Sequence, residues 1–98
     1  MIHIDDIMDA INSFTKENLV LHRKMTVHPK FKIYKTYSYN LYKVTKTGNE
    51  LLLNWDIVKY VPSEELKNAW VEADKQFLPV LFSWLSSDKY REINNDGV

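Results

Sequence analysis

Two runs of alternating apolar and polar residues constrain this fold most, because a period of two is the pattern of a half-buried β-strand. In residues 30–42, the apolar side chains occupy odd-numbered positions: Phe31, Ile33, Tyr37, Tyr39 and Leu41. In residues 50–58, the matching set is Leu51, Leu53, Trp55 and Ile57. Turn-forming residues around Gly48 separate the two runs. Residues 30–61 are therefore predicted to form one long β-hairpin whose apolar face forms the floor of the core.

The alternation also predicts a register, since a slip of one residue would place an apolar face opposite a polar one. A three-residue loop at 47–49 would pair Leu41 with Trp55 and would close the turn with Lys46 opposite Glu50. A loop of two or four residues would place the apolar side chains of one strand opposite the polar side chains of the other. The sequence thus favours a loop of odd length.

The first helix is predicted over residues 4–14, where an apolar stripe at helical spacing opposes several aspartates. Acidic residues early in a helix complement the partial positive charge of its N-terminus. The stripe, expected to face the core, consists of Ile4, Ile7, Met8, Ile11 and Phe14. Residues 18–28 can be read as a strand or as a continuing helix. Their alternation, their β-branched residues and the stop at Pro29 favour a strand.

The second helix is predicted to start at Ser63, which would serve as N-cap before two glutamates. Its expected core stripe is Leu66, Ala69, Trp70, Ala73, Phe77, Leu81 and Trp84. Pro79 interrupts this stripe and predicts a kink or a break, because proline lacks the backbone N–H that a helix interior uses. Residues 88–98 are expected to fray.

These elements predict an α+β fold of two layers: an antiparallel sheet of two or three strands, packed against an N-terminal helix and a Pro-kinked C-terminal helix. A chain of 98 residues is expected to form a single domain, 1–98. The N-terminus does not read as a signal peptide, and no apolar run is long enough for a membrane span. A cytoplasmic protein is expected.

Charge is unevenly distributed although the formal net charge is zero. Residues 1–17 carry a net −3, residues 18–49 carry +7 without any acid, and residues 50–98 carry −4. The Lys-, Asn-, Ile- and Tyr-rich composition is typical of short accessory proteins of AT-rich bacteria and their phages. It is a compositional trend, without a motif that identifies a family.

Catalytic and ligand motifs are not found in the sequence. Cysteine is absent, so thiol chemistry and Cys-based zinc sites are excluded. His3, His22 and His28 lack metal-site spacing, and two glycines cannot build a glycine-rich phosphate loop. The prediction is a protein that is not an enzyme and needs no cofactor or metal.

Two candidate surfaces follow. After Pro79, Val80, Phe82 and Leu85 lie off the main stripe and form a candidate protein interface, unless the fold buries them. The leading hypothesis is therefore a protein-binding module, such as an inhibitor, adaptor or immunity-type protein, with a protein partner or a homodimer.

The alternative hypothesis is single-stranded nucleic-acid binding through a basic, tyrosine-bearing sheet face, since lysines track phosphates while bases stack on aromatic rings. Its candidate residues are Arg23, Lys24, Lys30, Lys32, Tyr34 and Tyr42. A third hypothesis is a small-ligand pocket lined by Trp55, Trp70 and Trp84, although these side chains are expected to belong to the core.

Overall fold

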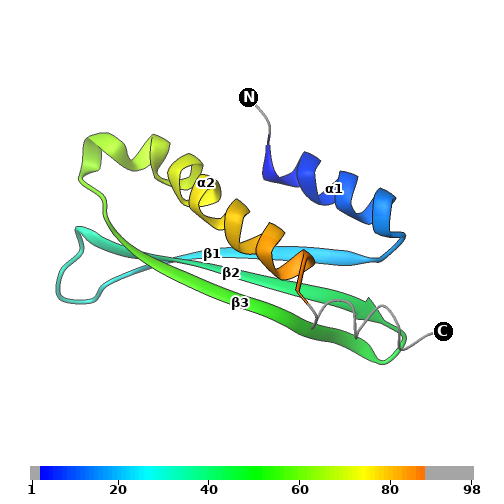
Figure 1. The fold of residues 1–98 in the computed structure, drawn as a ribbon. Coiled ribbons are helices and arrows are strands. Elements are labelled where there is room, and N and C mark those ends of the chain that lie inside the picture. Colours follow the sequence, from blue (N-terminus) through cyan, green and yellow to red (C-terminus); the bar gives the residue numbers. More distant parts are fainter. Residues whose placement is uncertain (1–2, 88–98) are drawn as a thin grey trace.

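A computed structural model describes residues 3–87, and it confirms the α+β architecture of an antiparallel sheet with helices packed on it (Figure 1). The three strands lie in the order β1-β2-β3. Helix α1 packs against β1, whereas α2 crosses β2 and β3. The elements are α1 (Ile4–Thr15), β1 (Leu19–Val27), β2 (Tyr34–Thr45), β3 (Gly48–Tyr60), the 3-10 turn η1 (Ser63–Glu65) and α2 (Leu66–Leu85).

The β2–β3 hairpin is present, but its predicted register and loop are wrong. Leu41 pairs with Leu53 rather than with Trp55, and the loop contains two residues, Lys46 and Thr47. Glu50 lies opposite Lys43 and not opposite Lys46. A two-residue loop agrees with the apolar alternation because a β-bulge between Leu41 and Tyr42 shifts the register by one residue.

This bulge also changes the sheet face on which two leucines of β3 lie, compared with the prediction. Leu53 pairs with Leu41 and packs on the core, but Leu51 pairs with Tyr42 and is exposed. Leu52, which the alternation assigned to the polar face, packs against the core instead. One inserted residue therefore reverses the alternation: beyond the bulge, positions that would have faced the core face solvent instead.

Strand β1 confirms the strand reading of residues 18–28, and the connection that follows it corrects the first arm of the hairpin. Strand β2 begins at Tyr34, so Phe31 and Ile33 lie in the β1–β2 loop and are exposed rather than part of the core floor. The His28 ring stabilises this loop: its Nδ1 accepts the backbone N–H groups of Lys30 and Phe31 at 3.1 and 3.0 Å.

Helix α1 ends at Thr15, one residue beyond the predicted range, and two residues of its stripe, Ile7 and Phe14, are not part of the core. Ile4 and Met8 are buried, whereas Phe14 is 90% exposed. The backbone leaves the helix through Lys16 in a left-handed conformation with φ 59°. The Asn12 side chain then joins the helix to β1, since its amide donates to Leu19 O and its Oδ1 accepts Leu19 N–H, both at 2.9 Å.

Helix α2 differs from its prediction at its start, and the break that was one of the two outcomes predicted at Pro79 is absent. Ser63 lies within the 3-10 turn that precedes the α-helix, so it is not the N-cap. The helix continues from Leu66 to Leu85 without a break at Pro79, whose side chain faces solvent. Leu66, at the start of the stripe, is exposed.

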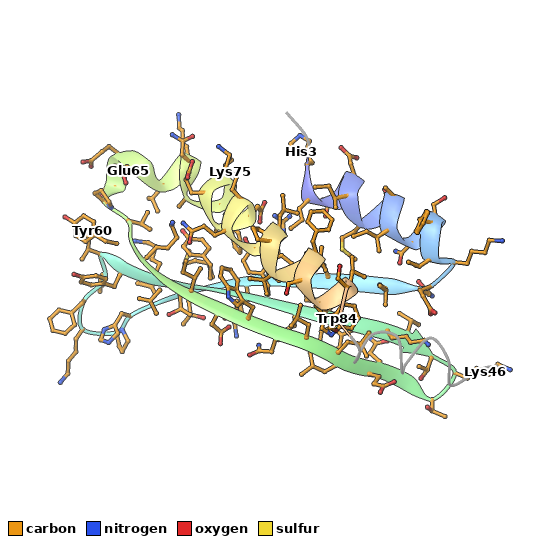
Figure 2. The ribbon with its side chains drawn as sticks, viewed as in Figure 1. His3, Lys46, Tyr60, Glu65, Lys75 and Trp84 are labelled. Atoms are coloured by element: carbon orange, nitrogen blue, oxygen red, sulfur yellow. The ribbon has the colours of Figure 1, made fainter. Side chains whose placement is uncertain are left out.

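The core lies between the sheet and α2, and both helices occupy the same face of the sheet (Figure 1). Trp84 points from α2 toward the sheet, whereas Lys75 points away from it (Figure 2). The largest fully buried side chains are Tyr37, Tyr39, Leu41, Phe77 and Leu81. Within residues 3–87, no helix combines the length and the hydropathy that crossing a membrane requires.

Candidate interaction surfaces

An apolar groove of about 410 Å³ lies between α1 and the C-terminal end of α2, and we call it the α1–α2 groove. It is lined by Ile7, Ala10, Ile11, Phe14, Thr15, Phe82 and Leu85. Threonine is the one polar residue type in this lining. The groove is therefore suited to apolar side chains rather than to a charged ligand.

Helical geometry explains why neighbouring residues of α2 divide between the core and the groove. Leu81 and Trp84 continue the buried stripe toward the sheet. Phe82 and Leu85 are each rotated by about 100° from them, because a helix has 3.6 residues per turn. That rotation turns Phe82 and Leu85 to the groove, and it leaves Phe82 48% exposed.

The opposite wall comes from α1, which lies over the edge strand β1 and not over the centre of the sheet. A helix in this position buries only the side of its apolar arc that faces the strand. Ile4 and Met8 occupy that side, and Ile7, Ile11 and Phe14 line the groove. The Asn12–Leu19 hydrogen bonds hold the helix there, and an ion pair of 3.3 Å joins Glu17 to Lys43 just beyond it.

The structure brings together two of the three residues predicted as a protein interface. Phe82 and Leu85 line the groove, but Val80 is half-buried, packs against the core and is absent from the lining. The sequence prediction missed the α1 wall because it assigned the whole α1 stripe to the core. The width of that stripe was the available signal, since Ile4 and Met8 are the only members of the stripe that are fully buried.

The six residues predicted for nucleic-acid binding lie on different parts of the molecule. Arg23 points to the helical side, where its Nη1 lies 2.9 Å from Asp74 and its guanidinium lies 5.4 Å from the Trp70 ring centre. Lys24, the next residue in the strand, points to the opposite face. The single basic face that the hypothesis assumed is thus divided between two sides of the sheet.

The other four residues occupy two separate places. Lys30 and Lys32 lie in the exposed β1–β2 loop beside Phe31, which is 60% exposed. Tyr34 begins β2 next to this loop, and its ring contacts that of Tyr60 edge-on at 5.6 Å. Tyr42 lies farther along β2, against the ring of His22 at 5.2 Å.

A polar cluster lies at the boundary of the core beneath α2. The Tyr39 hydroxyl donates a hydrogen bond to Asp74, whose other oxygen accepts from Arg23. Burial, followed by the hydrogen bond and the negative charge of Asp74, raises the pKa of Tyr39 far above its usual range. Tyr39 therefore keeps its proton at neutral pH, and the cluster joins β1, β2 and α2 as a structural link.

Neither a metal cluster nor a pocket lined by Trp55, Trp70 and Trp84 together is seen in the described part of the chain. No three acidic or histidine side chains among residues 3–87 lie close enough to hold a metal ion. Trp84 is buried, and Trp55 and Trp70 pack against the core, where Trp55 lies 5.7 Å from the Phe77 ring. The three tryptophans therefore contribute to packing.

Comparisons with protein families, curated proteins and solved structures gave no match to this chain. The function is accordingly argued from the surfaces themselves. The α1–α2 groove is a hollow with an almost wholly apolar lining, and the β1–β2 loop is a place where exposed lysines and aromatic rings lie together.

Proposed function

We propose that the protein is a non-enzymatic, cytoplasmic binding module that attaches to a partner protein through the α1–α2 groove. The observation that carries this proposal is the exposure of two phenylalanines, Phe14 and Phe82, on opposite walls of one apolar groove. Exposed aromatic residues around an apolar hollow are typical of protein interfaces. An inhibitor, adaptor or immunity-type protein would act in this way by covering part of its partner's surface.

The chemistry of the groove indicates what the partner presents. Its walls are two helices, and its lining offers almost no hydrogen-bonding groups. An extended peptide would leave its backbone N–H and C=O groups unsatisfied there, whereas a helix satisfies them internally. The groove therefore favours the apolar stripe of an amphipathic helix on the partner.

Matched substitutions of phenylalanine test this proposal. Wild-type protein and the variants Phe14→Gln and Phe82→Gln are used to capture partners from extracts of the source organism, and bound proteins are quantified by mass spectrometry. A partner recovered with wild type is then purified and titrated by calorimetry. Each groove variant is expected to weaken binding by tenfold or more, because a buried aromatic at the centre of an interface contributes about 2 kcal/mol or more.

Phe31→Gln is the matched control, since Phe31 is an exposed phenylalanine in the β1–β2 loop, away from the groove lining. This variant is expected to bind the partner as wild type does. Recovery of the same partners with equal affinity by all three variants would contradict the proposal. So would the absence of any partner together with a strictly monomeric protein in light scattering.

A second candidate function is single-stranded nucleic-acid binding, now at the β1–β2 loop. Lys30, Lys32 and Phe31 are exposed there, and the Tyr34–Tyr60 ring pair adjoins them. These residues offer two cations for phosphates and several rings for stacking bases. The site is smaller than the predicted one, because Arg23, Lys24 and Tyr42 are not part of it.

Fluorescence anisotropy with a mixed-sequence single-stranded oligonucleotide tests this second function. Binding should weaken steeply as salt is raised, and a Lys30→Ala/Lys32→Ala/Tyr34→Ala variant should lose it. Lys67→Ala/Lys75→Ala, which removes two exposed lysines of α2, is the control. Absence of binding at low salt, or equal binding by the loop variant and the control, would exclude this function.

A further inference from the structure

The sheet face opposite the helices, which we call the open face, is uncovered by any element of residues 3–87 (Figure 1). The strand register places on it a row of side chains from each strand. Several are apolar or aromatic and well exposed, with Val58 and Tyr60 at 65% and 59%. These exposed apolar side chains lie toward the two ends of the strands, and polar side chains such as Ser38 and Asn40 lie between them. Exposed apolar surface on a small protein is commonly an interface.

Charge on the open face is sparse and arranged with a symmetry. Within the strands, its formally charged residues are Lys24 on β1 and Asp56 on β3. Both are directly opposite Ser38 of the central strand, one on each side of it. Across three strands they lie about 10 Å apart, too far for an ion pair with each other. Among residues 3–87, neither has an ion-pair partner.

This arrangement is self-complementary under one particular rotation. A two-fold axis that runs along β2, between two stacked sheets, exchanges the edge strands and keeps each residue at its level along the sheet. Lys24 of one copy then lies over Asp56 of the second copy, and the reverse contact forms at the same time. An axis across the strands at Ser38 would instead place Lys24 over Lys24 and Asp56 over Asp56, which repel.

Two further rows agree with the same rotation. One row of the sheet contains Val20, Tyr42 and Leu51, so the exchange places Val20 of one copy over Leu51 of the other. In the next row His22 and Asn54 are at the two edges, and the exchange brings together a pair able to form a hydrogen bond. In both rows apolar groups meet apolar groups and polar groups meet polar groups, whereas the row at Thr36 places Thr26 of one copy over Val58 of the other.

The area of the open face is sufficient for a specific but modest dimer. Three strands spaced about 4.8 Å apart, with a paired length of roughly ten residues, cover about 500 Å² on each copy. The total of about 1,000 Å² is near the lower limit of specific protein interfaces. Face-to-face packing at about 10 Å is the standard arrangement of two sheets in a sandwich.

We propose that a second copy of this chain covers the open face, forming a two-fold dimer of four layers, helices-sheet-sheet-helices, in which Lys24 of each copy pairs with Asp56 of the other. The α1–α2 groove lies on the opposite side of the sheet. The dimer therefore leaves the groove free, and a partner protein could bind each copy. This inference goes beyond the proposed function and does not depend on it.

Charge reversal measured by sedimentation equilibrium tests the dimer. Wild type is expected to dimerise reversibly with protein concentration. Lys24→Glu and Asp56→Lys should each weaken the dimer at least tenfold, because either change creates two like-charge contacts per dimer. The double variant Lys24→Glu/Asp56→Lys exchanges the charges and should restore most of the wild-type affinity. Circular dichroism confirms that each variant is folded.

Glu64→Lys is the control, an equivalent reversal at an exposed residue of η1 on the helical side, and it should dimerise as wild type. A wild type that stays monomeric at all concentrations overturns the proposal, as does a double variant no better than the single ones. Single variants that dimerise as tightly as wild type would place the axis across the strands, because there each residue faces its own copy and reversal leaves like charge over like charge. Dissociation by Phe14→Gln but not by Asp56→Lys would assign the dimer to the groove, and either result overturns the proposal.

Discussion

At the residue scale, three polar side chains connect elements that are far apart in the sequence. Asp74 of α2 accepts hydrogen bonds from Tyr39 of β2 and from Arg23 of β1, and the Arg23 guanidinium also lies against Trp70. Tyr39 has no exposed surface, so its hydroxyl depends on Asp74 for a partner. A buried donor without a partner costs about 1–3 kcal/mol, which makes this contact specific for one placement of α2 on the sheet.

The raised pKa of Tyr39 predicts how the stability of the protein changes at alkaline pH. Its pKa is raised by burial and by Asp74, so the folded protein keeps a proton that the unfolded chain releases above the ordinary pKa of 10.0. The unfolded state then binds fewer protons, and the free energy of unfolding should decrease by about 1.4 kcal/mol per pH unit from this group. Urea titrations of wild type and Tyr39→Phe above pH 10 measure it.

Below pH 10 the same group should contribute no pH dependence, because it is protonated in both states. The Tyr39→Phe variant should show a shallower loss of stability in alkali than wild type, since the lysines and the other tyrosines titrate equally in both proteins. Parallel curves for the two proteins would contradict the assigned cause.

At the scale of elements, the hairpin shows what alternation predicts well and what it predicts poorly. Alternation correctly assigned Tyr37, Tyr39 and Leu41 to the buried face of β2. It did not reveal the bulge, because Leu52, which lies at the register shift, was interpreted as an apolar exception on the polar face of a regular strand. The predicted odd-length loop was the consequence of assuming two regular strands.

The hairpin turn makes a prediction about Gly48, which begins β3 with a φ of 133°. Non-glycine residues rarely adopt this backbone conformation, although no atom would obstruct a side chain there. Gly48→Ala is therefore expected to destabilise the protein by about 1–3 kcal/mol through backbone strain alone. Thermal and urea unfolding measure the change. Asn49→Ala is the neighbouring control and should cost less; equal effects would contradict a strain specific to Gly48.

The connection between α1 and β1 makes a prediction about Asn12. Its two hydrogen bonds to the Leu19 backbone are the direct polar link between the helix and the strand. Asn12→Ala should destabilise the protein by about 1–3 kcal/mol, because a backbone donor and an acceptor of a buried residue lose their partners. Hydrogen exchange should become faster throughout α1.

Asn12→Asp is the control for this contact, since a carboxylate can accept the Leu19 N–H but cannot donate to the Leu19 carbonyl. It should fall between wild type and Asn12→Ala in both stability and exchange. If α1 exchanges at the wild-type rate in the alanine variant, the helix is held by its apolar contacts and the Asn12 link is unimportant.

At the scale of the whole molecule, the sequence predicted the types of elements and their order, with two or three strands, but not where the helices lie on the sheet. Because α1 lies over the edge strand, Phe14 is exposed, although it belongs to the same helical stripe as the buried residues Ile4 and Met8. The same limitation affected the basic stretch. Its lysines follow one another in sequence, but β1 directs Arg23 and Lys24 to opposite faces.

Two phenylalanines that look alike in the sequence give the final test of this placement. Phe77 has no exposed surface and stacks on Tyr39 with ring centres 4.4 Å apart, whereas Phe14 is almost fully exposed. Phe77→Ala should cost about 3–5 kcal/mol through lost burial and the cavity that remains. Phe14→Gln should change the free energy of unfolding by no more than about 0.5 kcal/mol, as is usual for surface positions. Urea unfolding of both variants measures the difference. A large loss of unfolding free energy for Phe14→Gln would mean that this ring is packed inside the protein and does not form a wall of the α1–α2 groove.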